Sequence, residues 1–329
     1  METIAEKQIS PKKTIVLISI IAVLLIGFRF YKKYKVTYYM DTNDFKNQSE
    51  YQLAKAVKWQ NVRAITKLCK EHPEFVQRTY DDQYYSVLHW AVQIGKLKSA
   101  KALLDAGMNP NAQSRAYGTP IYALFENFAV YPPKQDKSLM TALLISYGAD
   151  CNIPGDRGSP LIPAVRWGNI DFMSVKLLLE KGNADINYKS QEGHTALGEA
   201  LDDAISFGDI KLVHYLVCEK HADVTIPCKI FLFSPLGKLT QSLSSPSIPD
   251  INNLDSEKDF TYPDEIEPVT LLRFLCYKLN SPAHKLKQEI IQEFKNQGVD
   301  YYAEPVPPEI EILIRQEYPD SWEEYLKEY

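Results

Sequence analysis

Apolar residues with helical spacing return along the chain at intervals of about 35 residues. When the sequence is compared with itself at a shift of 35 residues, residues 53–62 align with residues 88–97. The apolar positions continue to coincide beyond this segment. Four further copies begin at Thr119, Ser159, Thr195 and Ser234. The leucine-type anchors of successive copies are Leu53, Leu88, Ile121, Leu161, Leu197 and Leu236. A fixed period in this range predicts a stacked array of supersecondary units.

Within each copy, the polar and apolar positions predict two short helices. A Ser or Thr followed by a Pro or a small residue suits the N-cap and the first position of a helix. The first helix then carries a small residue beside an apolar one, a pairing that lets neighbouring units approach closely. These pairs are Ala56-Val57, Ala91-Val92, Ala164-Val165 and Ala200-Leu201.

A glycine turn then leads into the second helix, at Gly95, Gly168 and Gly208. The apolar residues of this helix fall two, five, eight and nine positions after the turn, which places them on one helical face. They are Leu97, Ala100, Leu103 and Leu104 in one copy and Ile210, Val213, Leu216 and Val217 in another. We expect the helix to end with a left-handed glycine C-cap at Gly107, Gly148 or Gly182.

This pattern resembles the ankyrin repeat. Residues 86–91, Ser-Val-Leu-His-Trp-Ala, stand where that family has its T-P-L-H-x-A motif, and residues 106–111, 147–152 and 182–187 are similar to its G-A-D-x-N helix exits. The resemblance extends over about residues 49–228. It implies an all-α solenoid of five to six helix-turn-helix repeats with a concave face that binds other proteins. It also implies that His89 forms hydrogen bonds between neighbouring loops.

The pattern departs from the family at three places. The third copy has about seven additional residues around 131–134, and the fifth has four before Gly208, about one helical turn. A stretch rich in Ser, Pro, Asp and Glu interrupts the array at 242–268, before helical patterns near 270–279 and 285–296. We predict a degenerate sixth repeat with a long acidic loop over 231–303. A capping tail over 304–329 would cover the last apolar face.

An apolar stretch near the N-terminus predicts a membrane anchor. Residues 14–28 read TIVLISIIAVLLIGF, and extension to position 31 gives a stretch just long enough for one transmembrane helix. A cleaved signal peptide is the alternative, but no small-residue cleavage site follows the stretch. A span at 14–31 leaves an N-terminal tail at 1–13 and a juxtamembrane linker at 32–48, before repeats at 49–230.

The basic residues around this span indicate its orientation. Four follow it closely (Arg29, Lys32, Lys33 and Lys35) and three precede it (Lys7, Lys12 and Lys13). The positive-inside bias therefore favours a repeat domain on the cytoplasmic face. The five cysteines are odd in number and form no CxxC pair, which favours reduced thiols in a reducing compartment over disulfides or zinc.

Charge changes sign along the chain. Residues 29–78 contain 11 basic and 5 acidic side chains, whereas residues 304–329 contain 8 acidic and 2 basic. The basic end favours an anionic lipid surface. The acidic end argues against a nucleic-acid partner.

The hydrophobic fraction of 45% is that of a folded protein, which excludes a disordered chain.

A search for reaction chemistry finds no motif. The sequence lacks GxxxxGK[ST], HExxH, GxSxG and a GxGxxG after a strand, so we expect no enzyme, no cofactor, no metal and no small-molecule substrate. His214 and Cys218 have the i, i+4 spacing that metal ligands use. However, Cys218 aligns with a core position, which favours a buried thiol. Asp202 and Asp203 favour a solvated helix end or a partner contact over acid catalysis.

The candidate partner-binding residues lie at the end of the first helix of each repeat, where the ankyrin resemblance implies that they face the concave side. We call these pairs the binding row: Lys58-Trp59, Gln93-Ile94, Glu126-Asn127, Arg166-Trp167 and Ser206-Phe207. Trp and Arg often dominate binding energy at interfaces. The alternative is that Trp59 and Trp167 only cover their own hairpins. Further candidates are Asp202, Asp203 and the loop residues Gln83, Tyr85, Arg157, Glu192 and His194.

These observations predict a membrane-anchored ankyrin-repeat scaffold that binds a protein partner and does not catalyse a reaction. Tethering at a membrane raises the effective concentration of such a scaffold, so modest affinity suffices. The alternative is an enzyme or effector with its activity in residues 231–329 and the repeats as a targeting arm.

Overall fold

The computed structural model describes residues 45, 49–77, 86–114, 117–126, 137–166, 171–229 and 265–329. The chain divides into two compact units, residues 1–51 with 128–133 and residues 52–127 with 134–329. Apart from Tyr51, the helices below belong to the second unit. The predicted anchor at 14–31, the insertion around 131–134 and residues 231–264 of the predicted sixth repeat with its acidic loop lie outside the described residues. Within the described ranges, no helix has both the length and the apolar character needed to cross a bilayer.

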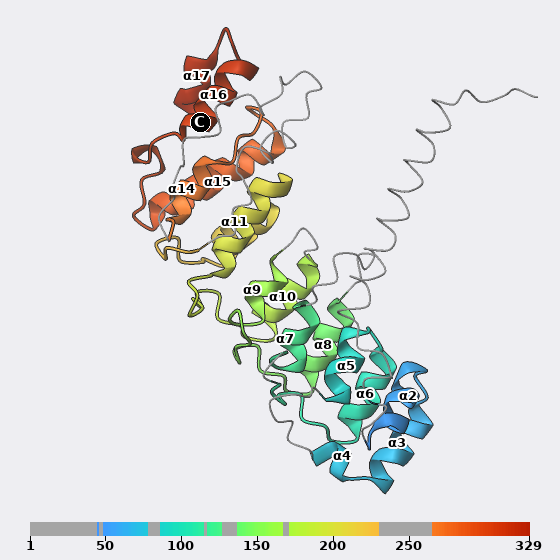
Figure 1. The fold of residues 1–329 in the computed structure, drawn as a ribbon. Helices are drawn as coiled ribbons and strands as arrows, with labels where there is room; N and C mark the ends of the chain where they lie inside the picture. The colour runs from blue at the N-terminus through green and yellow to red at the C-terminus, as the bar shows by residue number, and fades with distance from the viewer. Residues whose placement is uncertain are drawn as a thin grey trace, which may run out of the picture. The chain divides into compact units, whose positions relative to one another are not determined.

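The described helices come in successive pairs (Figure 1). The pairs are α2 (Tyr51–Lys58) with α3 (Val62–Glu71), α5 (Val87–Gln93) with α6 (Leu97–Asp105), α7 (Pro120–Phe125) with α8 (Ser138–Ser146), α9 (Leu161–Ala164) with α10 (Phe172–Glu180), α11 (Ala196–Phe207) with α12 (Lys211–His214), and α14 (Pro268–Arg273) with α15 (Pro282–Asn296). The short α4 (Glu74–Gln77) follows the first pair, and a π-helical turn, η2 (Tyr215–Glu219), continues α12. First helices pack on first helices from α5 to α14, and second helices pack in succession from α3 to α10. The described residues form no strand beyond isolated bridges in the loops.

The predicted apolar positions form the core of this array. All four pairs of small and apolar residues in the first helices are buried. In the second helices, Ala100, Leu103 and Leu104 of one repeat and Ile210, Val213, Leu216 and Val217 of another are buried too. Leu97, at the first position of α6, is half-buried. The helical period read from the sequence therefore identified the packing faces.

Ser or Thr caps three of the first helices as predicted, but α9 differs. The hydroxyls of Ser86, Thr119 and Thr195 accept hydrogen bonds from backbone N–H groups of α5, α7 and α11. Before α9, the Ser159 hydroxyl is buried and has no hydrogen-bond partner among the described residues. There Pro160 has helical angles and the helix is a single short turn, so Ser159 does not serve as the cap.

The glycine C-caps hold in two repeats and fail in a third. Gly107 and Gly148 have positive φ angles of 96° and 85°. In the fourth repeat the positive φ, 54°, belongs to Asn183, so the prediction of a left-handed Gly182 is wrong. Glycine is required at 182 for space, because a Cβ atom there would lie 2.4 Å from the Cys151 sulfur and 2.8 Å from the Leu178 oxygen.

An asparagine at each helix exit joins one repeat to the next. The Asn111 side chain donates to the Gly148 oxygen at 2.8 Å and accepts from the Asp150 nitrogen at 2.7 Å. Asn152 makes the same two bonds one repeat later, to the Asn183 oxygen and the Asp185 nitrogen. These residues belong to the G-A-D-x-N exits, so the motif has a structural role as a link between repeats.

The sixth helix pair and the tail extend the array beyond the region of clear sequence periodicity. The first predicted helix of this pair ends early, at Arg273, and the second begins early, at Pro282, with Ser281 as its N-cap. α14 packs on α11, and α15 packs on α12 and η2. A 3-10 turn, η4 (Tyr301–Ala303), follows α15, and the tail contains α16 (Pro308–Glu317) and α17 (Trp322–Glu328).

Two tyrosines fasten the tail to the sixth repeat. The Tyr325 hydroxyl donates to the Tyr277 oxygen, and the Tyr329 hydroxyl donates to the Arg273 oxygen. Both tyrosine side chains are buried. The buried Lys287 amine lies 3.8 Å from the centre of the Tyr329 ring and donates to the Leu275 oxygen at 2.8 Å. The tail therefore packs against the sixth helix pair through specific contacts.

Candidate protein-binding face

The binding row has exposed aromatic residues near its two ends. Trp59, directly after α2, is 77% exposed, and Phe207, the last residue of α11, is 63% exposed. Lys58, Gln93 and Ile94 are half-buried. Asn127 and Trp167 lie outside the described residues, as do the loop candidates Gln83 and Tyr85. The pairing of Arg166 with Trp167 therefore stays a prediction.

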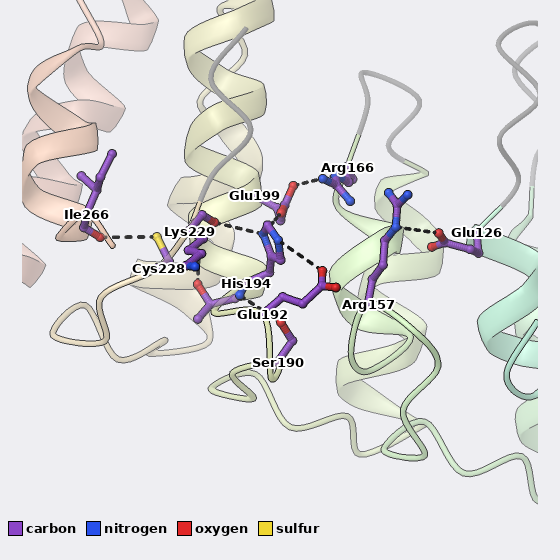
Figure 2. A network of polar contacts seen from close by, with 12 residues as sticks. Glu126, Arg157, Arg166, Ser190, Glu192, His194, Glu199, Cys228, Lys229 and Ile266 are labelled. Atoms are coloured by element: carbon purple, nitrogen blue, oxygen red, sulfur yellow. Dashed lines mark hydrogen bonds and ion pairs between the residues drawn. The ribbon is translucent and has the colours of Figure 1, made fainter. Parts of the chain in front are cut away.

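Ion pairs fix the charged side chains in the middle of the binding row. Glu126, directly after α7, accepts from Arg157 of the following loop, with Nε and Oε1 3.2 Å apart. Arg166, which follows α9, pairs with Glu199 of α11 at 3.0 Å, and both side chains are almost fully buried. Figure 2 shows these two pairs on neighbouring repeats. The charges at the centre of the row therefore bind the repeats to one another.

His194 extends this network into the next loop (Figure 2). Its Nδ1 atom lies 2.9 Å from Glu199 Oε1 and 3.1 Å from the Lys229 oxygen. Its backbone N–H donates to the Ser190 hydroxyl at 3.0 Å. Glu192 is exposed, with its carboxylate 3.8 Å from His194 Nε2. Of the predicted loop residues, His194 thus has a buried linking role, and Glu192 stays available to solvent.

Burial changes the proton affinity of the paired groups. Burial raises the pKa of the Glu126 carboxyl, and the neighbouring Arg157 opposes this rise. Burial lowers the pKa of the Arg166 guanidinium, and Glu199 opposes that change. A buried charge of this kind is stable only with its partner. The network therefore fixes the geometry of the face. Removal of one charge of a pair would leave the other buried without its partner.

The two aspartates of α11 differ in exposure. Asp202 is half-buried, whereas Asp203 is 8% exposed. α11 is longer than the other first helices of the array and ends at a left-handed Gly208. The four additional residues inferred from the sequence thus lengthen this helix. Asp202, Asp203 and Phe207 all lie in the lengthened α11, which forms the last unit of the binding row.

His89 has the linking role that the family resemblance implied. Its Nε2 atom lies 3.0 Å from the Gly118 oxygen of the next loop, and its Nδ1 atom lies 2.7 Å from the Ser86 hydroxyl. This prediction is confirmed. One repeat later, Tyr122 stands at the equivalent position and its hydroxyl accepts from the Arg157 backbone N–H at 3.0 Å.

The pairing of Cys218 with His214 as metal ligands finds no support in the geometry. His214 Nε2 lies 2.6 Å from a Glu289 carboxylate oxygen, and Cys218 is half-buried. Burial, followed by the nearby carboxylates of Glu293 and Glu289, raises the pKa of Cys218 to about 11. Within the described ranges, no group of three or more His, Cys, Asp or Glu side chains is arranged to hold a metal ion.

Sequence reasoning missed Glu199 and Tyr122. Glu199 lies in the first turn of α11 and is the carboxylate on which both Arg166 and His194 converge. An available signal was an acidic residue at a position where α5, α7 and α9 have Trp90, Ala123 and Pro163. For Tyr122 the signal was its place exactly one repeat after His89, at the same offset from the capping Thr119 as His89 has from Ser86.

Family models match two parts of the chain. A model of the ankyrin repeat matches residues 83–115, and a model of ankyrin repeats in three copies matches residues 127–228. These parts of the chain are ankyrin repeats. The ankyrin matches end before α14, so the sixth helix pair is assigned from its packing alone.

Solved structures of ankyrin repeat proteins are similar to this chain. An ankyrin repeat domain from Acinetobacter baumannii AYE is similar with a TM-score of 0.51 and 18% sequence identity, over 77% of this chain and 100% of that chain, which supports the fold. A second crystallised ankyrin repeat protein has a TM-score of 0.45 and 25% identity, over 58% of this chain and 90% of that chain. No curated protein matches the chain. Ankyrin repeats generally serve as protein-interaction scaffolds rather than as enzymes.

Proposed function

We propose that this protein is a membrane-anchored scaffold that holds a protein partner on its ankyrin repeats and does not catalyse a reaction. The observation that carries the proposal is the exposed Phe207 at the end of α11, the helix whose first turn holds Glu199 in its ion pair with Arg166. Exposed aromatic residues beside fixed polar groups are typical of binding hot spots. A face whose charges are already held in place loses little conformational entropy on binding.

The chemistry of the cysteines supports a non-catalytic role. Burial raises the pKa of Cys151 to about 11 and that of Cys228 to about 12. Burial also raises the pKa of Cys69 and Cys276. A nucleophilic cysteine needs a lowered pKa, because the thiolate is the reactive form. These thiols therefore serve the core.

Affinity capture from detergent-solubilised native membranes tests the protein-binding proposal. The full-length chain is compared with Phe207→Ala/Asp202→Ala and with Ile312→Ala, which changes an exposed apolar residue of α16 away from the row. Loss of a hot spot costs about 2 kcal/mol or more, so we expect the row variant to retain the partner about 30-fold more weakly. The Ile312→Ala variant should capture it as the wild type does.

All three proteins are first shown to melt alike. Equal capture by the row variant would show that the partner binds elsewhere. If neither the wild type nor the row variant captures a protein, the scaffold proposal fails. Residues 231–329 would then be assayed for an enzymatic or effector activity.

The anchor is tested separately, by alkaline extraction of membranes that contain the full-length chain. We expect the wild type to stay with the membrane pellet and the variant Ile21→Lys/Leu24→Lys to be released, because a charged residue at the centre of a span opposes insertion. Release of the wild type would contradict the anchor. It would leave the partner-capture experiment unaffected.

A further inference from the structure

The turn between α2 and α3 exposes a small apolar wedge. Trp59 is 77% exposed and Val62 is 42% exposed, on either side of a turn in which Gln60 has a positive φ of 50°. The apolar surface does not continue into the second repeat, where the equivalent Ile94 is half-buried. Protein interfaces have a contiguous apolar centre. Among the residues that the structure describes, this wedge is therefore isolated.

Basic side chains surround the wedge. Residues 51–70 contain five basic residues and no acidic one. Arg63 is exposed next to Val62. The exposed Lys98 of the second repeat lies beside the same turn, because its backbone N–H donates to the Gln60 side chain at 3.3 Å. Lys67 pairs with Glu71 at 3.7 Å, and both of these side chains are well exposed.

The fifth repeat provides an internal contrast. Phe207 occupies the place equivalent to Trp59 and is comparably exposed. Its neighbours in the chain are acidic: Asp202 and Asp203 precede it, and Asp209 follows it. The two ends of the binding row thus combine an exposed aromatic residue with opposite charge. They are suited to different occupants.

We propose that the α2–α3 turn is a contact site for an anionic lipid surface, with Trp59 and Val62 at the boundary of headgroups and acyl chains. Trp prefers this boundary because its indole is both apolar and a hydrogen-bond donor. Arg63, Lys58 and Lys98 lie around the wedge, where anionic headgroups attract basic side chains. An isolated apolar wedge within a basic surface suits a lipid bilayer better than a protein partner.

The site rests on the proposed anchor only for its local concentration. Positions 32–50 separate the predicted span from the start of α2 at Tyr51. A linker of this length extends to at most about 70 Å, so the first repeat stays near the bilayer surface. Trp59 then meets lipid by a short movement rather than by diffusion from solution.

The test measures quenching of Trp59 fluorescence by brominated lipids in the full-length chain. The protein is reconstituted in nanodiscs of phosphatidylcholine with or without phosphatidylserine, and the Trp59 signal is the difference between wild type and Trp59→Phe. We expect quenching that requires phosphatidylserine. Replacing Arg63 and Lys98 by Ala should weaken the contact equilibrium about fivefold for each charge removed. In the matched control, Trp59→Phe/Phe207→Trp, the new Trp should not be quenched.

An unquenched Trp59 would overturn the proposal, as would equal quenching at position 207. A benzoyl-phenylalanine photo-crosslinker at position 59 that captures a protein in membranes would also overturn it. If alkaline extraction shows that the chain is not anchored, the same quenching is measured with brominated vesicles added to the free chain. Quenching that requires phosphatidylserine would then support the lipid-contact site even though the chain is not anchored.

Discussion

The imidazole of His89 must stay neutral to keep its place between two repeats. Its Nδ1 atom accepts from the Ser86 hydroxyl and backbone N–H, so the proton resides on Nε2, which donates to the Gly118 oxygen. Burial lowers the pKa of His89 to about 4. The unfolded chain therefore takes up this proton at higher pH than the folded chain does.

The stabilisation linked to His89 should be fully present above pH 6.5 and should be lost as the pH falls from 6.5 toward 4. The loss amounts to roughly 3 kcal/mol. His89→Gln cannot titrate in this window, so we expect it to be less stable than the wild type at pH 7 and to approach the wild type at pH 4.5. Urea unfolding at the two pH values measures the gap. A gap of constant size would contradict the assigned protonation.

The pair formed by Arg166 and Glu199 gives a second prediction for single residues. Arg166→Met leaves the buried Glu199 carboxylate without this partner, which we expect to cost about 3–5 kcal/mol. Arg166→Met/Glu199→Leu removes both charges and should cost less than Arg166→Met alone. Arg315→Ala, which breaks an exposed pair with Glu311, should change stability by less than about 1 kcal/mol.

Urea unfolding of these variants, with Glu199→Leu alone to complete the cycle, decides the matter. If the double variant is as unstable as the sum of its single variants, the ion pair does not couple the two repeats. A structural cost at Arg166 would also explain any loss of partner binding in Arg166 variants, so such variants do not by themselves identify a contact residue.

Helix caps differ between repeats in a way that a matched pair of variants tests. The Ser86 hydroxyl accepts from the His89 N–H in a capping box, whereas the Ser159 hydroxyl is buried without a partner among the described residues. We expect Ser86→Ala to cost about 1 kcal/mol. Ser159→Ala should be neutral or slightly stabilising, because it removes an unsatisfied polar group. Thermal or urea unfolding measures both, and equal losses would contradict the assignment.

The predictability of the helices follows from how local each determinant is. The small and apolar pairs of the first helices were readable because burial at the helical period leaves a pattern in the sequence. Gly107 and Gly148 were readable because a left-handed C-cap favours glycine. The requirement at Gly182 is different, since it comes from the approach of Cys151, which belongs to the preceding helix exit.

The tail gives a prediction for the molecule as a whole. Tyr329 is buried and contacts both Arg273 and Lys287, so Tyr329→Ala should open a cavity and uncover two buried cations, at a cost of about 3–5 kcal/mol. In a repeat array each unit contacts only its neighbours, so the effect should stay local. Amide hydrogen exchange should accelerate in α15 and α17 and remain unchanged in α3 and α6. Tyr302→Ala, at an exposed tyrosine, serves as the control.

Accelerated exchange throughout the array would instead show that the tail stabilises all repeats together. Either result also bears on the proposed function. A local effect would mean that the tail can be altered without disturbing the binding row, whereas a global effect would require every tail variant to be checked for folding before its binding is interpreted.

The sequence alone predicted the helix pairs and their order, because each depends on spacing within one repeat, and its resemblance to the ankyrin repeat implied the linking role of His89. It also located the binding row as positions along the chain. Only the tertiary structure decided which of these positions reach solvent. Trp59 and Phe207 do, whereas Arg166 is buried against Glu199 of the next repeat. Pairing of charges between repeats leaves no period in the sequence, and burial depends on every neighbour at once.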